Sequence, residues 1–500
     1  MKKLFFSLLL LVLIIPNAFS QKREIPTDTV ITTSHQATIN GQNFNYEANV
    51  GTLPVWNKDN EPIATLFYTY YKRSLSKPDD SRPLVFSFNG GPGSASVWMH
   101  IGYTGPKILN LDKEGMPVQP YGVKDNPYSI LDVADIVYVD PVNTGYSRMV
   151  KNKDGKDPDR SQFFGINADI KYLAEWMNTF VSRYNRWNSP KFIIGESYGG
   201  TRVMGLAEEL QNKQWMYLNG VIMVSPADYK LYNNGLISTA INIPYYTAAA
   251  WYHNKLPSDL QNRELESILP ESEQFAINEV LPALVNGAFL NESRKQQLAE
   301  KMAKYTGLDK ERILDQNLDL STFYFWKELL RDDKMIIGRL DSRYLGIDKK
   351  DTGDRPEYFP ELTSWNHSFT PPINHYLKND LEFVTDTKYN MFGDVHPWDL
   401  TENNTRDRLR QAMAQNPYLN VLVQSGYYDG ATTYFQAKLT MGLVDPSGKM
   451  KDRLTFKAYK SGHMMYVRDE DLKQSAADLR NFILKSIGHK TSAKYDNTKN

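Results

Sequence analysis

Hydrophobic residues along this chain fall into two patterns that predict strands and helices in turn. Short apolar runs bounded by turn residues are typical of buried strands, and they occur at 83–88, 135–140, 191–194, 221–225, 419–426 and 454–459. Runs with helical character lie between or after them, at 167–184, 201–210 and 470–487. Because strands and helices alternate, the chain predicts an α/β fold with a mostly parallel central sheet and helices on both faces.

Two stretches depart from this alternation. Residues 27–72 cluster β-forming residues between turns, which predicts an antiparallel meander at one edge of the sheet. From Tyr229 to Leu330 the pattern is helical and charged, and from Gly338 to Asp399 it is irregular and rich in proline and aromatic residues. We therefore expect a largely helical cap that shapes access to the core. The expected division is core at 21–226, cap at 227–410, core at 411–490 and a loose tail at 491–500.

The first twenty residues predict an export signal. Met1-Lys2-Lys3 precede an apolar run from Leu4 to Ile15, and Ala18-Phe19-Ser20 offers small residues for cleavage before Gln21. The run is too short to span a bilayer comfortably, so a removed signal peptide at 1–20 is favoured over a membrane anchor. The mature protein is expected to be secreted or periplasmic.

Composition excludes several classes of function. Basic and acidic residues balance at 58 each, so the net charge of zero does not favour nucleic-acid binding. With no cysteine the chain has neither disulfides nor a thiol nucleophile. It also lacks a His-Glu-x-x-His motif and a phosphate-binding glycine signature, so no metal or cofactor is expected. The oligomeric state is left open.

One hexapeptide, Gly195-Glu196-Ser197-Tyr198-Gly199-Gly200, lies between a predicted strand and a predicted helix. Gly-x-Ser-x-Gly in that context is the nucleophile-elbow pattern, in which a strained turn presents the serine hydroxyl above the sheet. A glycine-rich turn with an incidental serine is the alternative reading of the motif alone. The rest of the chain must therefore supply a base, an acid and an oxyanion hole.

Those remaining parts follow other predicted strands. The loop Asn89-Gly90-Gly91-Pro92-Gly93-Ser94 ends the strand at 83–88, and its glycines would let backbone N–H groups point at a developing oxyanion. Asp429 and His463 each follow a later strand. The order Ser197, Asp429, His463 is that of α/β-hydrolases, so we expect a catalytic triad of nucleophile, orienting acid and base.

Together with the loop 141–147 and Gly462-His463-Met464, these motifs resemble the serine carboxypeptidase family (peptidase S10). The resemblance covers nearly the whole mature chain and implies an α/β-hydrolase fold with an inserted cap. It also implies release of single amino acids from the C-termini of peptides or proteins. The oxyanion donors would then be the N–H groups of Gly91 and Tyr198.

The resemblance further implies a site for the terminal carboxylate of the substrate, formed by Asn89, Gly90 and Glu196. The family pairs the glutamic acid at the position of Glu196 with a second glutamic acid, and one of the two stays protonated. Here Tyr103 occupies the position of that second glutamate, and Tyr466 stands where the family usually has proline. We expect Tyr103 to donate a hydrogen bond to the carboxylate instead, with a less acidic pH optimum.

Two other functions fit the same motifs. An esterase or acyltransferase on this fold would use the same nucleophile on other acyl groups. An inactive binding protein could keep the scaffold, although the intact residues Ser197, Asp429 and His463 argue against it.

Overall fold

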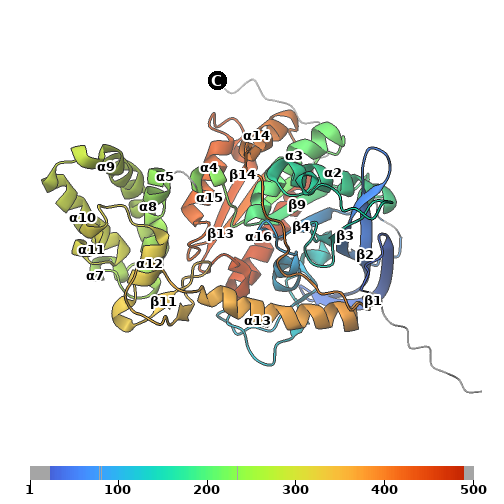
Figure 1. Ribbon diagram of the computed structural model, residues 1–500, viewed down its shortest axis with the longest axis horizontal. Helices are drawn as coiled ribbons and strands as arrows, with labels where there is room; N and C mark the ends of the chain where they lie inside the picture. The colour runs from blue at the N-terminus through green and yellow to red at the C-terminus, as the bar shows by residue number, and fades with distance from the viewer. Residues whose placement is uncertain (1–22, 78, 80, 233–234, 402, 489–500) are drawn as a thin grey trace, which may run out of the picture.

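The computed structural model describes residues 23–77, 79, 81–232, 235–401 and 403–488. The predicted signal peptide at 1–20 and the predicted tail at 491–500 lie outside these described residues. The chain forms a large central sheet with helices packed on it and a lobe of helices on one side, at the left of Figure 1.

The central sheet has ten strands, and its order along the main path is β1-β2-β3-β7-β4-β9-β10-β13-β14, with β8 paired to β3. The strands β1 to β3 form the expected antiparallel meander at one edge. From β7 to β14 every pairing is parallel. The bounds are β1 Thr29–Ile39, β2 Gln42–Trp56, β3 Pro62–Arg73, β4 Leu84–Phe88, β7 Asp135–Val139, β8 Arg148–Met149, β9 Lys191–Glu196, β10 Gly220–Val224, β13 Asn420–Gly426 and β14 Leu454–Tyr459.

The strand order reverses beside β4. The chain leaves β4 for β7 on one side and later returns to β9 on the other side, so β4 lies between them. In open parallel sheets such a reversal opens a crevice at the carboxyl ends of the strands. The loops that follow β4 and β9 therefore meet at one place.

Helices cover both faces of the sheet. One face packs against α2 (Ile166–Arg183), α3 (Tyr198–Lys213), α14 (Thr405–Gln415) and part of α15 (Tyr434–Val444). The other packs against α1 (Val97–Met99), the short π-helix η1 (His100–Thr104), α13 (Pro360–His375) and α16 (Asp469–Ile487). The apolar face predicted for 167–184 is buried in α2, which confirms that part of the helical pattern.

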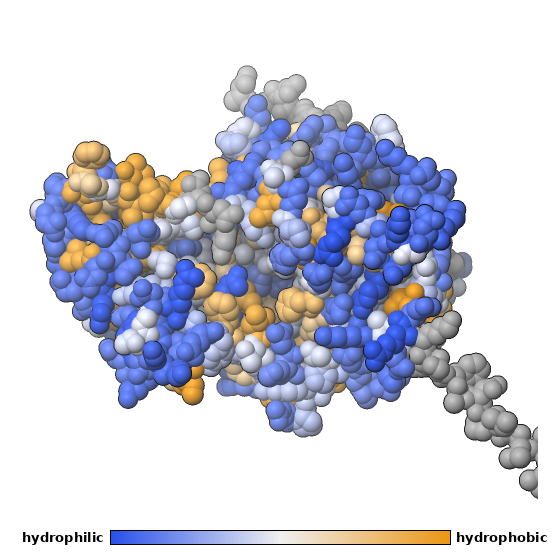
Figure 2. Space-filling view, in the orientation of Figure 1, coloured by the Kyte–Doolittle hydropathy of each residue, from blue (hydrophilic) through white to orange (hydrophobic). Residues whose placement is uncertain are grey.

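The helical lobe has a hydrophobic core of its own. Its outer end exposes apolar side chains around α9 (upper left of Figure 2), where Val285 is 68% and Phe289 94% exposed. Its helices are α4 Tyr229–Tyr232, α5 Gly235–Ile241, α6 Ile243–Tyr252, α7 Ser258–Gln261, α8 Leu265–Phe275, α9 Leu281–Asn286, α10 Glu292–Thr306, α11 Lys310–Asp315 and α12 Thr322–Glu328. Two small hairpins pair β5 (Lys107–Leu109) with β6 (Val123–Asp125) and β11 (Ile336–Ile337) with β12 (Leu345–Gly346).

The stretch expected to be irregular, 338–399, contains the helix α13 of 16 residues. Pro360 opens this helix, where proline costs no hydrogen bond, and Trp365, Phe369 and Ile373 bury one face against the sheet layer. Further along, Phe392 forms a β-bridge with Ser94, beside the loop that follows β4. The cap predicted at 227–410 therefore consists of two parts, because the stretch that contains α13 packs on the core and not on the helical lobe.

Neither a membrane span nor a metal cluster stands out in the described ranges. None of the helices there is long and apolar enough to cross a membrane. The same ranges hold no group of three or more histidines and carboxylates placed to bind a metal ion.

Candidate active site

Ser197 occupies the sharp turn between the end of β9 and the start of α3. Its backbone has φ 61° and ψ −124°, a conformation that residues other than glycine rarely adopt. A Cβ on Gly195 would overlap the backbone of Gly199, and one on Gly200 would lie 2.5 Å from Pro226. The glycines of the hexapeptide therefore allow the close approach that the strained turn requires.

Asp429 and His463 lie together at the ends of β13 and β14. The Nδ1–H of His463 donates to Oδ2 of Asp429 at 2.7 Å, and both side chains are buried. Thr432 donates its hydroxyl to the same oxygen at 2.7 Å, and the N–H groups of Ala431 and Thr432 donate to Oδ1 at 2.9 and 3.1 Å. Every oxygen of this carboxylate is thus saturated with donors that fix its orientation.

The charge around His463 favours the imidazolium. Burial alone lowers its pKa, but the negative charges of Asp429 and Glu196 outweigh burial and raise the pKa above its ordinary value. Arg339 opposes this effect. A histidine in this setting can accept a proton and hold the resulting charge beside its carboxylate partner.

A segment from the middle of the chain, 339–344, holds the loops of both residues. The N–H of Gly430 donates to the carbonyl of Arg339 at 2.9 Å, and the N–H of His463 donates to the carbonyl of Leu340 at 2.7 Å. The N–H of Ser342 donates to the carbonyl of Tyr428 at 3.0 Å. The segment therefore bridges the two loops that carry the aspartate and the histidine.

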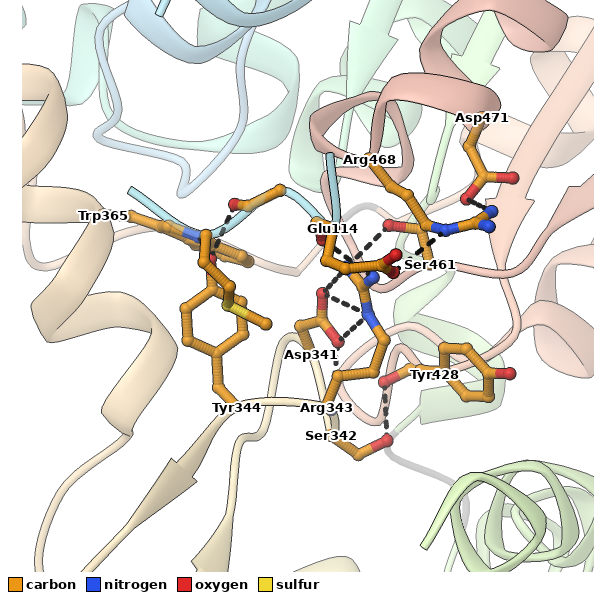
Figure 3. Close-up of polar contacts among 12 residues, drawn as sticks. Glu114, Asp341, Ser342, Arg343, Tyr344, Trp365, Tyr428, Ser461, Arg468 and Asp471 are labelled. Carbon is orange, nitrogen blue, oxygen red and sulfur yellow. Dashed lines mark hydrogen bonds and ion pairs between the residues drawn. The ribbon is translucent and has the colours of Figure 1, made fainter. Parts of the chain in front are cut away.

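Figure 3 shows how side chains anchor this segment. Arg343 pairs with Asp341 at 2.7 Å, and both side chains are at most 1% exposed. The same guanidinium donates to the hydroxyl of Ser461 and to the carbonyl of Glu114, at 3.0 Å each. The hydrogen bond from Arg343 to Ser461 thus ties 339–344 to the loop that precedes His463.

The loop after β4 brings backbone N–H groups next to Ser197. A Cβ on Gly90 would lie 2.6 Å from the nitrogen of Tyr198, so only glycine fits there. The N–H groups of Gly91 and Tyr198 donate no hydrogen bond to any acceptor among the described residues. Two free N–H groups beside a serine are suited to bind an oxyanion.

Glu196 is buried beside the nucleophile. Its Oε2 accepts hydrogen bonds from the amide of Asn89 and, at 2.9 Å, from the hydroxyl of Tyr466. Its Oε1 has no partner. Burial raises the pKa of Glu196 to about 7, so near neutral pH much of this carboxyl carries a proton.

Tyr103 lies elsewhere than we expected. Its ring is fully buried and stacks on the ring of Tyr466, with centroids 4.7 Å apart. Its hydroxyl donates to Gln424 at 2.9 Å, and the residue does not line the pocket that holds Ser197. The tyrosine that contacts Glu196 is Tyr466, which sequence reasoning noted only as a departure from the family.

One pocket collects most of the predicted site. Ser197, His463 and Glu196 line it together with the glycine loop, and Asp429 lies behind His463. The remaining wall comes largely from apolar side chains and one arginine, namely Trp98, Arg339, Leu340, Leu362, Trp365, Phe392 and Met464.

The topology of the sheet, with the elbow at the end of β9, defines the α/β-hydrolase fold. Among solved structures, the chain is similar in fold to a prohormone-processing carboxypeptidase from Saccharomyces cerevisiae, Kex1(Δ)p. The two share 15% sequence identity with a TM-score of 0.54, over 88% of this chain and 91% of that one.

The family model described as serine carboxypeptidase matches residues 40–469. The chain therefore belongs to the serine carboxypeptidase family. Serine carboxypeptidase-like 36 of Arabidopsis thaliana is 28% identical over 193 residues, which are 36% of this chain and 37% of the plant protein. Serine carboxypeptidase S10 family member 1 of Dictyostelium discoideum is 29% identical over 152 residues, 30% of this chain and 32% of that protein. The matches thus span about a third of the length of these curated relatives.

Proposed function

We propose that this protein is an exported serine carboxypeptidase that hydrolyses the C-terminal bond of peptides and proteins. Family membership supports hydrolysis of this kind. The observation that carries the carboxypeptidase assignment is Glu196: a buried, unpartnered carboxyl oxygen beside Ser197 in the same pocket. An esterase has no need of such a group, whereas a free C-terminus offers the anion that it can bind.

In the proposed mechanism Ser197 Oγ attacks the carbonyl carbon of the last peptide bond. His463 takes the proton of the hydroxyl and passes it to the leaving amine, while Asp429 orients the imidazole and stabilises its charge. The N–H groups of Gly91 and Tyr198 bind the oxyanion. Water then attacks the acyl-enzyme, with His463 again acting as base.

The terminal carboxylate would be bound by the loop after β4 and by Glu196. When Glu196 is protonated, its Oε1 can donate a hydrogen bond to an anion, whereas the ionised form would repel it. Asn89 and Gly90 line the same pocket as Glu196. Two carboxyl groups thus share one proton across the contact between enzyme and substrate.

The experiment is mass spectrometry of a mixed peptide set incubated with the protein near pH 5 and pH 7.5. We expect stepwise loss of C-terminal residues, no loss from peptides with an amidated C-terminus, and no activity in Ser197→Ala. Cleavage of amidated peptides at the same rate would contradict the carboxypeptidase assignment. Intact peptides with Ser197 still labelled by a fluorophosphonate would favour the esterase or acyltransferase, and absence of labelling the inactive binding protein.

The pH dependence of KM tests the role of Glu196. Its pKa of about 7 predicts that KM for a free-acid peptide rises about tenfold per pH unit above that value, because the ionised carboxyl repels the substrate. The hydrogen bond from Tyr466 favours the ionised form of Glu196, so Tyr466→Phe should raise the pKa of Glu196. The pH above which KM rises, here called the pH limit, should then be higher. Steady-state kinetics across pH 5 to 9 measure both.

Tyr103→Phe is the matched control for this shift. It also removes one phenolic hydroxyl, but that hydroxyl donates to Gln424 and does not touch Glu196. We expect its pH limit to stay at the wild-type value. A shift of the pH limit in Tyr103→Phe with none in Tyr466→Phe would contradict this assignment and favour Tyr103 as the residue that binds the substrate carboxylate.

A further inference from the structure

Arg339 places one permanent positive charge on the wall of the pocket that holds Ser197. Among the residues that line the pocket it is the only lysine or arginine, and Glu196 is the only carboxyl group. Because Glu196 is largely protonated below neutral pH, the arginine dominates the electrostatics of an otherwise apolar wall.

This guanidinium has no counter-ion in the part of the chain that the structure describes. None of the ion pairs or side-chain hydrogen bonds of the described residues involves Arg339. Its guanidinium carbon lies 5.4 Å from the centroid of the Phe359 ring. Two other cations among the described residues do have a counter-ion: Lys327 pairs with Asp348 at 2.5 Å, and Arg343 pairs with Asp341 at 2.7 Å.

Glu361 interacts electrostatically with Arg339, but among the described residues no ion pair or hydrogen bond joins the two side chains. Its Oε1 accepts the N–H of Leu340 at 2.8 Å, and burial raises its pKa to about 7. A carboxyl that is half protonated near neutral pH neutralises an arginine poorly. The positive charge of Arg339 is therefore available to a ligand.

The backbone beneath Arg339 is held in place. Its carbonyl accepts the N–H of Gly430, the next carbonyl accepts the N–H of His463, and the buried pair Asp341–Arg343 anchors the residues that follow (Figure 3). Because this backbone is already fixed, the guanidinium of Arg339 can bind an anion without the entropic cost of ordering a loop.

We propose that Arg339 binds a carboxylate of the substrate within this pocket and makes anionic ligands preferred over neutral ones. Its planar fork can hold both carboxylate oxygens, and the apolar wall accommodates the body that bears them. The proposal rests on the proposed function for the view that the ligand is a peptide. The carboxylate is then either the free C-terminus or an acidic side chain next to the scissile bond.

The first test is protection of Ser197 from a fluorophosphonate label by hydrocinnamate and by its neutral amide, hydrocinnamamide. Near pH 8.5 Glu196 is ionised, so any preference for the acid must come from another group. We expect Arg339→Met to lower the ratio of the affinities for acid and amide about 10- to 100-fold relative to the wild type, because ionised Glu196 repels the acid equally in both proteins.

Arg355→Met is the matched control, because Arg355 is exposed and also stacks on an aromatic ring, that of Phe323, outside the pocket. It should keep the wild-type preference, and Arg339→Lys should keep part of it. The same ratio of acid to amide affinity in the wild type and in Arg339→Met would overturn the proposal.

The second test separates the two sources of the carboxylate. It compares blocked dipeptides ending in Leu, Glu and Gln, each with a free or amidated C-terminus, in wild type and Arg339→Met. Loss of the preference for Glu over Gln supports an acidic side chain, and an equal loss for all free acids supports the terminal carboxylate; no change in either ratio overturns the proposal. If the wild type cleaves none of these peptides, the proposed function fails, while the protection assay still decides the role of Arg339.

Discussion

Replacing Asp429 with asparagine should lower kcat for a blocked dipeptide by about 10⁴-fold while leaving the fold intact. The Oδ2 of Asp429 accepts the Nδ1–H of His463 and the hydroxyl of Thr432. An amide there no longer holds the imidazole in the tautomer that accepts a proton from Ser197, nor does it stabilise the charge that develops. Steady-state kinetics against the wild type measure the loss, with Ser197→Ala as the inactive reference.

Asp452→Asn is the control for this substitution. Asp452 lies on the surface between β13 and β14, and the same change there should leave kcat unaltered. A loss of less than tenfold in Asp429→Asn would mean that another group orients His463. Circular dichroism and unchanged thermal unfolding would show that the variant is folded.

Arg343→Met should lower the free energy of unfolding by about 3–5 kcal/mol. The change leaves Asp341 as an uncompensated charge in a site where both side chains are at most 1% exposed. It also removes the hydrogen bonds to Ser461 and to the carbonyl of Glu114. Urea unfolding followed by tryptophan fluorescence measures the loss.

Two comparisons sharpen this prediction. Arg263→Met removes a surface pair between Arg263 and Glu271, whose side chains are 37% and 47% exposed, and should leave the free energy of unfolding close to that of the wild type. Replacing Asp341 by leucine in the Arg343→Met background should recover part of the loss, because no buried charge then remains. A single variant as stable as the wild type would show that the pair does not anchor the segment 339–344.

Much of the core could be predicted because its signals are local. Parallel strands buried on both faces read as continuous apolar runs, and each expected strand from 83–88 to 454–459 overlaps an observed one. The helix α13 was missed because its prolines suggested irregular chain. The four-residue spacing of Trp365, Phe369 and Ile373, all buried, carried the correct signal.

The contacts around Glu196 could not be read from spacing. Tyr103 and Tyr466 come from distant parts of the chain, and their rings stack almost parallel, at 6°. Which of two stacked rings faces the carboxyl depends on packing of the loop after His463, which no local pattern encodes. Arg339 was missed for a similar reason, since it enters the pocket from a segment that the sequence placed only in the cap.

The order of the site residues along the chain also has a consequence for synthesis. Ser197 follows β9, whereas Asp429 and His463 follow β13 and β14, near the end of the 500 residues. At about 5–20 residues per second, a ribosome completes the elbow on the order of tens of seconds before the histidine emerges. In the proposed mechanism the serine lacks its base during that interval, so we expect a chain truncated before His463 to be inactive. The strand order thus delays the proposed peptidase activity until β14 and the loop that follows it have been synthesised.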